Sequence, residues 1–257
     1  MEWSEFSRRT RNDLVRAWAI TKKDMRIYYL KPPNLVAGIL MPVFLFLAFM
    51  VRSNLSAEAL IPRLMAMTIF FGASTVPMSV IPFERSQRTF ARLLTAPVSI
   101  YAVLGGKAIA GVLFGVILSV SALLIGIVGF GMRVGNPLLF IVVVLLSNLA
   151  FAAMGILFAA WRGQTPGDVM IMGNTTRLPL MFVSGIFIPL SDLPTWARGI
   201  AYLSPLTYCN DLLNTAIRGQ GYLGAPIDIG ALILFLALFA FFGMRWHESK
   251  RREGEYA

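Results

Sequence analysis

The 257-residue sequence has few charged residues: Asp, Glu, Lys and Arg together make up only 14% of it. A soluble domain of ordinary composition carries about 25% of such residues. Hydrophobic residues reach 57%, and they are grouped in long uncharged blocks. Blocks of about 17 to 25 residues match the length that a helix needs to cross a bilayer. The composition therefore excludes a water-soluble globular domain and predicts an integral membrane protein with an all-α fold.

Cysteine and histidine are almost absent from the sequence. Cys209 and His247 are the only residues of their kinds. A single cysteine excludes an intrachain disulfide and a cysteine-based metal cluster, and a single histidine excludes a His-rich metal site. We therefore expect no metal and no cofactor bound by this chain, and we expect His247 to be an interfacial side chain.

A phosphate-binding loop of the form GxxxxGK[ST] is also missing. The nearest candidate, GGKA at 105–108, lacks the upstream glycine and the Ser or Thr that would contact Mg²⁺. If the protein uses ATP, then ATP and Mg²⁺ bind to a partner chain, and this chain is not itself an enzyme.

Six apolar blocks are long enough to cross the membrane. They lie at 35–51, 61–82, 101–130, 137–161, 168–189 and 228–246. The fifth block has the weakest apolar pattern, because the polar run from Asn174 to Arg177 interrupts it. No linker or internal repeat divides the chain, so we predict one domain over 1–257. It comprises a cytoplasmic segment at 1–31, a bundle at 35–246 and a basic tail at 247–257.

The placement of Lys and Arg predicts the orientation. The N-terminal segment holds eight, the connection at 83–107 holds four, and the tail from Arg245 holds four. The alternate connections hold five in all. This asymmetry places both termini in the cytoplasm. The net charge of +10 does not indicate nucleic acid as a partner, because the basic residues flank apolar blocks, where they meet anionic membrane lipids.

Residues 3–30 have the pattern of an amphipathic helix that lies on the membrane. Leu14, Trp18, Met25 and Tyr29 fall on one stripe, with the basic residues away from it. A helix of this kind lies in the headgroup plane with its tryptophan buried in lipid. A solvated basic tail is the alternative.

The connection at 190–227 is long and has an apolar stripe of its own. Leu193, Trp196, Ile200 and Leu203 recur at steps of three and four residues, and Ser191 or Asp192 can cap the helix. We expect one or two short helices that lie against the outer membrane surface or dip into it.

Two polar residues of the fifth block suggest different functions. Arg177 either lines a substrate path together with Asn174, or extends to the cytoplasmic interface. Ser184 raises the alternative of an intramembrane serine protease, which needs a GxSG nucleophile and a histidine base on another span. Here Phe182 replaces the glycine and His247 lies at the end of the last block, so the protease is disfavoured.

The stretch at 83–94 carries charges between two apolar blocks. On a helical wheel, Glu84, Arg85, Arg88 and Arg92 share one side and Phe83, Phe90, Leu93 and Leu94 the other. Glu84 precedes Arg88 by four residues, a favourable spacing for an ion pair. We predict a short two-faced cytoplasmic helix whose apolar side enters a groove of a partner protein.

Two motifs resemble a known family. ERSQRTFARLLTAPVSIYAVLGGK at 84–107 is similar to the first cytoplasmic connection of ATP-binding-cassette (ABC) type-2 permeases, which has an ER-rich start, a leucine pair, a TPVS-like end and a following GK. SGIFIPLSDLPTWARGIAYLSPLTY at 184–208 resembles the outer segment after the fifth span of that family. Prokaryotic drug, nodulation-factor and polysaccharide exporters are the most similar subgroup.

The resemblance implies a role for each of these segments. Within the family, the permease pairs with a separate nucleotide-binding subunit, two permease copies or paralogues assemble, and the transporter usually exports. The implied coupling helix contains Glu84, Arg85, Arg88, Phe90, Leu93 and Leu94. The implied interfacial helix contains Leu14, Trp18 and Met25. The implied outer re-entrant segment contains Ser184, Gly185, Pro189, Leu193, Trp196 and Pro205. One departure is FARLL, with Phe90 and Ala91 where LE is common.

The sequence thus predicts the permease subunit of an ABC exporter in a prokaryotic plasma membrane. A secondary transporter is the first alternative, but it would need ion-coupling carboxylates that the predicted spans lack. A membrane scaffold without transport activity is the second alternative.

Overall fold

A computed structural model describes residues 2–31, 40, 43–44, 57–95, 98–161 and 165–253. These residues form helices and connections and contain no strand. The helices are α1 (Glu2–Asp24), its π-helical continuation η1 (Met25–Tyr29), α3 (Ala57–Ser86), α4 (Thr89–Thr95), α5 (Ile100–Phe130), α6 (Pro137–Ala159), α7 (Pro166–Val183), the 3₁₀ turn η2 (Leu190–Asp192), α8 (Thr195–Ala201), α9 (Pro205–Arg218) and α10 (Ala225–Arg252). The predicted all-α fold is confirmed for the described residues.

Four of the described helices, α3, α5, α6 and α10, are long and apolar enough to cross a membrane. They correspond to the second, third, fourth and sixth predicted blocks. The fifth block forms α7, which ends at Val183 because the chain turns at Ser184 and Gly185, and α7 is not among the four. The first block, 35–51, lies outside the described residues except for positions 40, 43 and 44.

Local signals explain where the helices begin and end. The Ser99 hydroxyl accepts a hydrogen bond from the Ala102 amide at the start of α5, and Gly131 ends that helix with a left-handed φ of 64°. Thr165 and Asp168 form a reciprocal capping box at the start of α7. The predicted cap of the outer helix is wrong, because α8 follows Pro194 without a side-chain cap.

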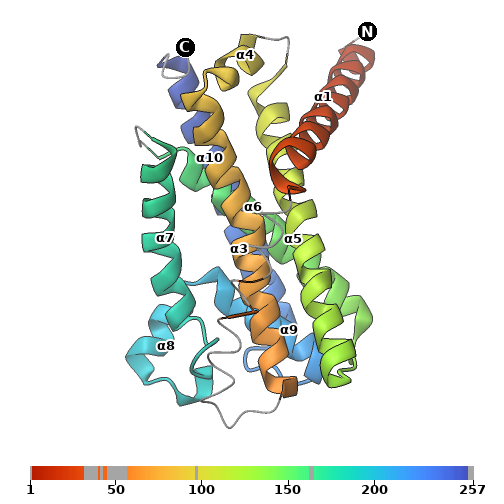
Figure 1. The fold of residues 1–257 in the computed structure, drawn as a ribbon, viewed down its shortest axis with the longest axis vertical. Coiled ribbons are helices and arrows are strands. Elements are labelled where there is room, and N and C mark those ends of the chain that lie inside the picture. Colours follow the sequence, from red (N-terminus) through yellow and green to blue (C-terminus); the bar gives the residue numbers. More distant parts are fainter. Residues whose placement is uncertain are drawn as a thin grey trace.

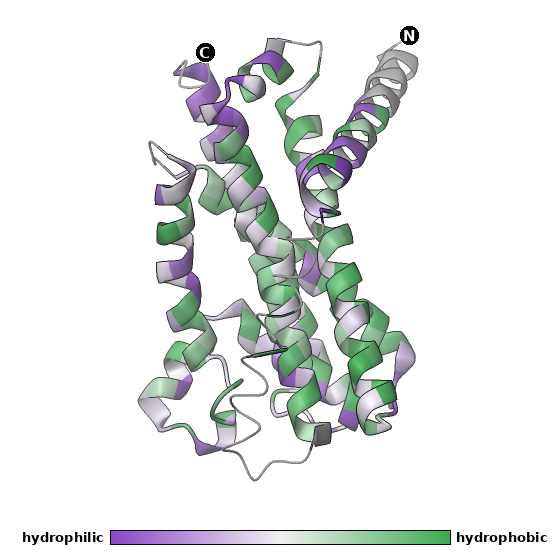
Figure 2. Cartoon of the chain, viewed as in Figure 1, coloured by the Kyte–Doolittle hydropathy of each residue, from purple (hydrophilic) through white to green (hydrophobic). Residues whose placement is uncertain are grey.

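The long helices run between two ends of the molecule (Figure 1). The N-terminus, α4 and the C-terminus lie at one end, whereas α8 and α9 lie at the other. Hydrophilic residues gather on α1 and on the last turns of α10, and hydrophobic residues dominate the middle of the bundle (Figure 2). This arrangement is typical of a protein that crosses a bilayer.

Helix α3 lies at the centre of the bundle and packs against α5, α6, α7 and α9. In its most apolar window 83% of the residues are buried, compared with 17% in α10. Close approach of α5 to α6 depends on Gly115, where an added Cβ would overlap the side-chain amide of Asn148. The core therefore surrounds α3, and α10 presents most of its apolar surface outward.

Candidate functional site

The charged stretch at 83–94 is not one helix. Helix α3 continues to Ser86, the chain turns at Gln87 and Arg88, and α4 begins at Thr89. Arg88 adopts a left-handed φ of 55°, and the Thr89 hydroxyl donates a hydrogen bond to the Glu84 carbonyl. The predicted continuous helix and its Glu84–Arg88 ion pair are therefore wrong, because the turn changes the direction of Arg88.

Glu84 instead belongs to a buried cluster of four charges, which we call the ion cluster: Lys23, Asp24, Glu84 and Lys107. The Lys107 ammonium lies 2.6 Å from Glu84 Oε2 and 3.1 Å from Asp24 Oδ2. The Lys23 ammonium contacts the same two carboxylates. Two positive and two negative groups balance, which is the condition under which buried charges are tolerated.

The ion cluster joins three helices that are far apart in sequence. Asp24 ends α1, Glu84 lies near the end of α3, and Lys107 lies near the start of α5. Gly106 allows α1 to approach, because a Cβ there would lie 2.6 Å from the carbonyl oxygen of Ala17. The Thr21 hydroxyl also donates to the Gly106 carbonyl at 2.8 Å. The GK pair at 106–107 thus has a physical role: Gly106 leaves room for α1 to pack closely, and Lys107 forms an ion pair with Asp24 at the end of α1.

The apolar side of α4 faces the interior of this chain. Phe90 is completely buried in a cluster of apolar side chains from four other helices, which are Ile20, Ile81, Ile100, Val103, Leu104, Ile156 and Ala159. Leu94 packs against the same cluster and Leu93 is half-buried. The prediction that Phe90 enters a groove of a partner is therefore wrong, because its side chain is already used to anchor α4.

The exposed side of α4 and of the turn before it is polar. We call this the α4 surface, and it consists of Ser86, Gln87, Arg88, Thr89, Arg92 and Thr95. Arg85 is only half-exposed at its edge. Any partner that binds here meets hydroxyl, amide and guanidinium groups, while Phe90 and the ion cluster connect the surface to α1, α3, α5 and α6.

The Arg177 side chain extends from α7 to α3 and is only 1% exposed. Its guanidinium donates to the hydroxyls of Ser74 and Thr75 on α3, at 2.8 and 2.9 Å, and to the Asn174 side chain. It also lies over the Phe71 ring at 5.1 Å from the centroid. The prediction that Arg177 extends to the interface is wrong. Among the described residues no carboxylate lies within ion-pair distance of it.

The predicted outer segment forms η2, α8 and α9, in agreement with the expectation of short helices. Its apolar stripe is divided: Leu193 is buried, whereas Trp196 is 72% exposed and Leu203 is 70% exposed. Gly185, with φ of 79°, makes the turn after α7, and its carbonyl accepts from Asn210. The remaining residues of the motif shape the turn: the Ser184 hydroxyl donates to the Met181 carbonyl, Pro189 precedes η2, and Pro205 is the first residue of α9.

The N-terminal segment is helical, but its predicted stripe is also divided. Leu14 and Trp18 are 64% and 58% exposed, whereas Tyr29 is buried and Met25 packs beside it. The reason is that α1 turns Ala17, Ile20 and Thr21 toward the bundle instead. Leu14 and Trp18 remain available to lipid.

The His247 side chain lies inside the protein and does not contact the membrane surface directly. It is fully buried, and its Nε2 lies 3.0 Å from the carbonyl oxygen of Ile156. Within the described part of the chain, no three His, Cys, Asp or Glu residues are grouped in a way that could hold a metal ion.

The helices and their two ends define a class: an α-helical multi-pass membrane protein with a short amphipathic helix between two long apolar ones. Residues 15–217 match the family described as ABC-2 type transporter. The chain therefore belongs to the ABC-2 type transporter family and is the membrane permease subunit of an ABC transporter. Permeases of this family work with ATP-binding subunits.

Several bacterial proteins are similar to this chain. The inner membrane transport permease YadH of Escherichia coli strain K12 is 22% identical over 197 residues, which cover 77% of this chain and 76% of YadH. The probable multidrug ABC transporter permease YbhR of the same strain is 24% identical over 153 residues, or 59% of this chain and 41% of YbhR. Nodulation protein J of Rhizobium leguminosarum bv. viciae is 29% identical over 97 residues, or 37% of each protein.

Proposed function

We propose that this permease exports its substrate across the plasma membrane of a prokaryote, driven by ATP and Mg²⁺ bound to a separate ATP-binding subunit that docks on the α4 surface. The observation that carries the proposal is the packing of α4 against the other helices. Phe90 anchors it among four helices and the ion cluster lies beneath it. A force on the α4 surface would therefore move α1, α3, α5 and α6 together.

This proposal assigns the end that carries α1, α4 and the C-terminus to the cytoplasm. The distribution of Lys and Arg favours it, since sixteen of these residues lie in segments of that end and five in the alternate connections. The outer end then carries α8 and α9, and the exposed Trp196 and Leu203 lie at the outer membrane surface. Leu14 and Trp18 contact lipid at the cytoplasmic surface.

The proposed pathway involves a second permease copy or a paralogue and six crossing segments, including α7 and block 35–51. Arg177 and Asn174 lie on α7 at the depth of the middle of α3. A buried guanidinium held by neutral groups keeps its positive charge available to a passing substrate. Arg177 is therefore the residue that we assign to the substrate path.

Single cysteines test the docking site and the orientation together. The native Cys209 is buried, so an added cysteine can be labelled selectively. With the cognate ATP-binding subunit co-expressed, we expect Arg92→Cys to cross-link to that subunit and to react with an impermeant thiol reagent only in inverted vesicles. Trp196→Cys, at the opposite end, is the matched control and should react only from outside. Cross-linking from position 196 and not from 92 would exclude the α4 surface as the docking site.

A further inference from the structure

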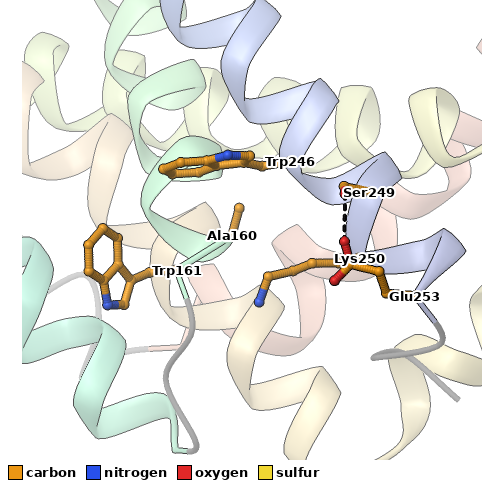
Figure 3. Close-up of a pocket in the computed structure, with 6 residues that line it drawn as sticks. All are labelled: Ala160, Trp161, Trp246, Ser249, Lys250 and Glu253. Atoms are coloured by element: carbon orange, nitrogen blue, oxygen red, sulfur yellow. Dashed lines mark hydrogen bonds between the residues drawn. The ribbon is translucent and has the colours of Figure 1, made fainter.

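A hollow of about 400 Å³ lies between the ends of α6 and α10, and none of its lining residues belongs to the α4 surface or to the contacts of Arg177. Its lining residues are Ala160, Trp161, Trp246, Ser249, Lys250 and Glu253. Figure 3 shows the two indoles on different sides of the hollow, with the Lys250 side chain extending from α10 toward the Trp161 side. None of these residues takes part in the coupling or the substrate path described above.

An apolar row on α10 leads to this hollow. Leu238, Phe242 and Trp246 recur every four residues, so they share one side of the helix, and Lys250 continues the same series. The three apolar side chains are 40%, 48% and 46% exposed, whereas Lys250 is only 6% exposed. Since α10 is long and apolar enough to cross a membrane, this row faces either lipid chains or another membrane helix. The Lys250 ammonium group lies at the end of the row and lines the hollow.

The hollow also contains both signs of charge. The Lys250 ammonium is the positive group, and the Glu253 carboxylate, which accepts a hydrogen bond from the Ser249 hydroxyl at 2.8 Å, is the negative one. The Trp161 and Trp246 rings meet edge to face, with centroids 6.5 Å apart. Tryptophans at the ends of membrane helices lie at the level of the lipid headgroups, and indole faces attract cations.

We propose that this hollow binds one membrane phospholipid whose headgroup carries both a phosphate and a primary ammonium, as phosphatidylethanolamine does. The phosphate contacts Lys250, the ammonium lies between Glu253 and an indole face, and an acyl chain follows Leu238 and Phe242. The row of apolar side chains favours a lipid over a soluble phosphate. Glu253 favours an ammonium-bearing headgroup over an anionic one, because it repels net negative charge.

Native mass spectrometry of the purified full-length chain in detergent tests the proposal. The chain is titrated with phosphatidylethanolamine and with phosphatidylglycerol of the same acyl composition. We expect one tightly retained phosphatidylethanolamine, bound about threefold more tightly than phosphatidylglycerol. Soluble glycerophosphoethanolamine at equal concentration should not displace it, because it lacks the chains that contact α10. Equal retention of the two lipids, or displacement by the soluble headgroup, overturns the proposal.

Variants locate the site. Lys250→Met should weaken phosphatidylethanolamine binding about tenfold, and Lys250→Arg should restore most of it. Glu253→Gln, at an exposed position, should abolish the preference between the two lipids while phosphate binding remains. Arg251→Ala and Trp196→Ala are the charge and aromatic controls and should bind as the wild type does. If Lys250→Met and Glu253→Gln both behave like these controls, the lipid does not bind in this hollow.

Discussion

Two groups of buried charge lie in the same bundle and are held in different ways. In the ion cluster two lysines and two carboxylates neutralise one another, and Lys107 and Asp24 are completely buried. Arg177 is equally buried, but its described partners are hydroxyls, an amide and an aromatic ring. The charges of the first site neutralise one another, whereas the positive charge of Arg177 has no carboxylate partner among the described residues.

This difference separates a structural role from a functional one. A neutral cluster can hold helices together without attracting an ion, and its cost of desolvation is offset by its internal pairs. A cation without a counterion is costly in the interior of a membrane protein, and it is rarely kept there unless a substrate or path uses it. The comparison therefore predicts that changes at the ion cluster reduce stability, and that changes at Arg177 reduce transport.

The largest effect is expected for Lys107→Met. It leaves Asp24 and Glu84 with only Lys23, and breaking a buried ion pair in this way costs about 3–5 kcal/mol. We expect a clear fall in Tm, measured by fluorescence-detected size-exclusion chromatography after heating. The double variant Lys107→Met with Glu84→Gln keeps the Lys23–Asp24 pair and removes both other charges, so it should be more stable than either single variant. If the Tm decreases of the two single variants add up in the double variant, the four charges do not act as one cluster.

Replacing Arg177 should reduce transport without reducing stability, in contrast to changes at the ion cluster. Arg177→Met removes a desolvated charge, so the Tm of the purified protein should stay equal or rise, while ATP-dependent transport into inverted vesicles is lost. Transport is measured with whichever probe of a dye and lipid panel the wild-type complex accumulates. Arg177→Lys should retain part of the activity because a cation remains. Full transport by Arg177→Met would show that the substrate does not use this charge.

The sequence predicted the fold and the class well and the site only in part. Helix α5 could be predicted over nearly its whole length, because its apolar run contains a single charge, Lys107, and ends at Gly131. The ion cluster around Glu84 could not be predicted. Its other members, Lys23, Asp24 and Lys107, are distant from Glu84 in the chain, and a helical wheel considers only neighbours in sequence. The helical wheel also assumed one continuous helix over 83–94, whereas the chain forms two helices separated by a turn at Arg88.

Which apolar residues face lipid and which face protein was a harder problem. Inside a membrane both environments are apolar, so composition does not distinguish the buried Phe90 from the exposed Trp196. The contacts of Arg177 with Ser74 and Thr75 were missed for a related reason. Serine and threonine are common in membrane helices, so their presence in the sequence does not indicate a partner for a buried arginine. The GK pair at 106–107 was a usable signal, but only the approach of α1 explains it.

A smaller effect is expected for Lys23, the partly exposed member of the cluster. Burial acts to lower the pKa of its ammonium, but hydrogen bonds and ion pairs with Asp24 and Glu84 outweigh this and raise the pKa above the ordinary value of 10.5. A raised pKa stabilises the folded state fully below 10.5, and this contribution is lost as the pH rises through the shifted value. Lys23→Met should therefore cost about 1 kcal/mol or less, and its Tm difference from wild type should be the same at about pH 6 and pH 9. A difference that disappears between these values would contradict the assigned protonation state.

The smallest effect on stability is expected on the α4 surface, where Arg92 is exposed and belongs to neither buried site. Arg92→Ala should change the free energy of unfolding by no more than about 0.5 kcal/mol, as exposed substitutions usually do. Its effect should appear instead in the complex, because a charge at the rim of an interface governs association more than folding. We expect co-purification with the ATP-binding subunit to become more sensitive to salt, and ATP-driven transport to fall with it. Thr95→Ala, on the same surface but uncharged, is the matched control and should show neither change. If Arg92→Ala lowers Tm as much as Lys107→Met does, the division of this end into a buried structural layer and an exposed docking layer is wrong.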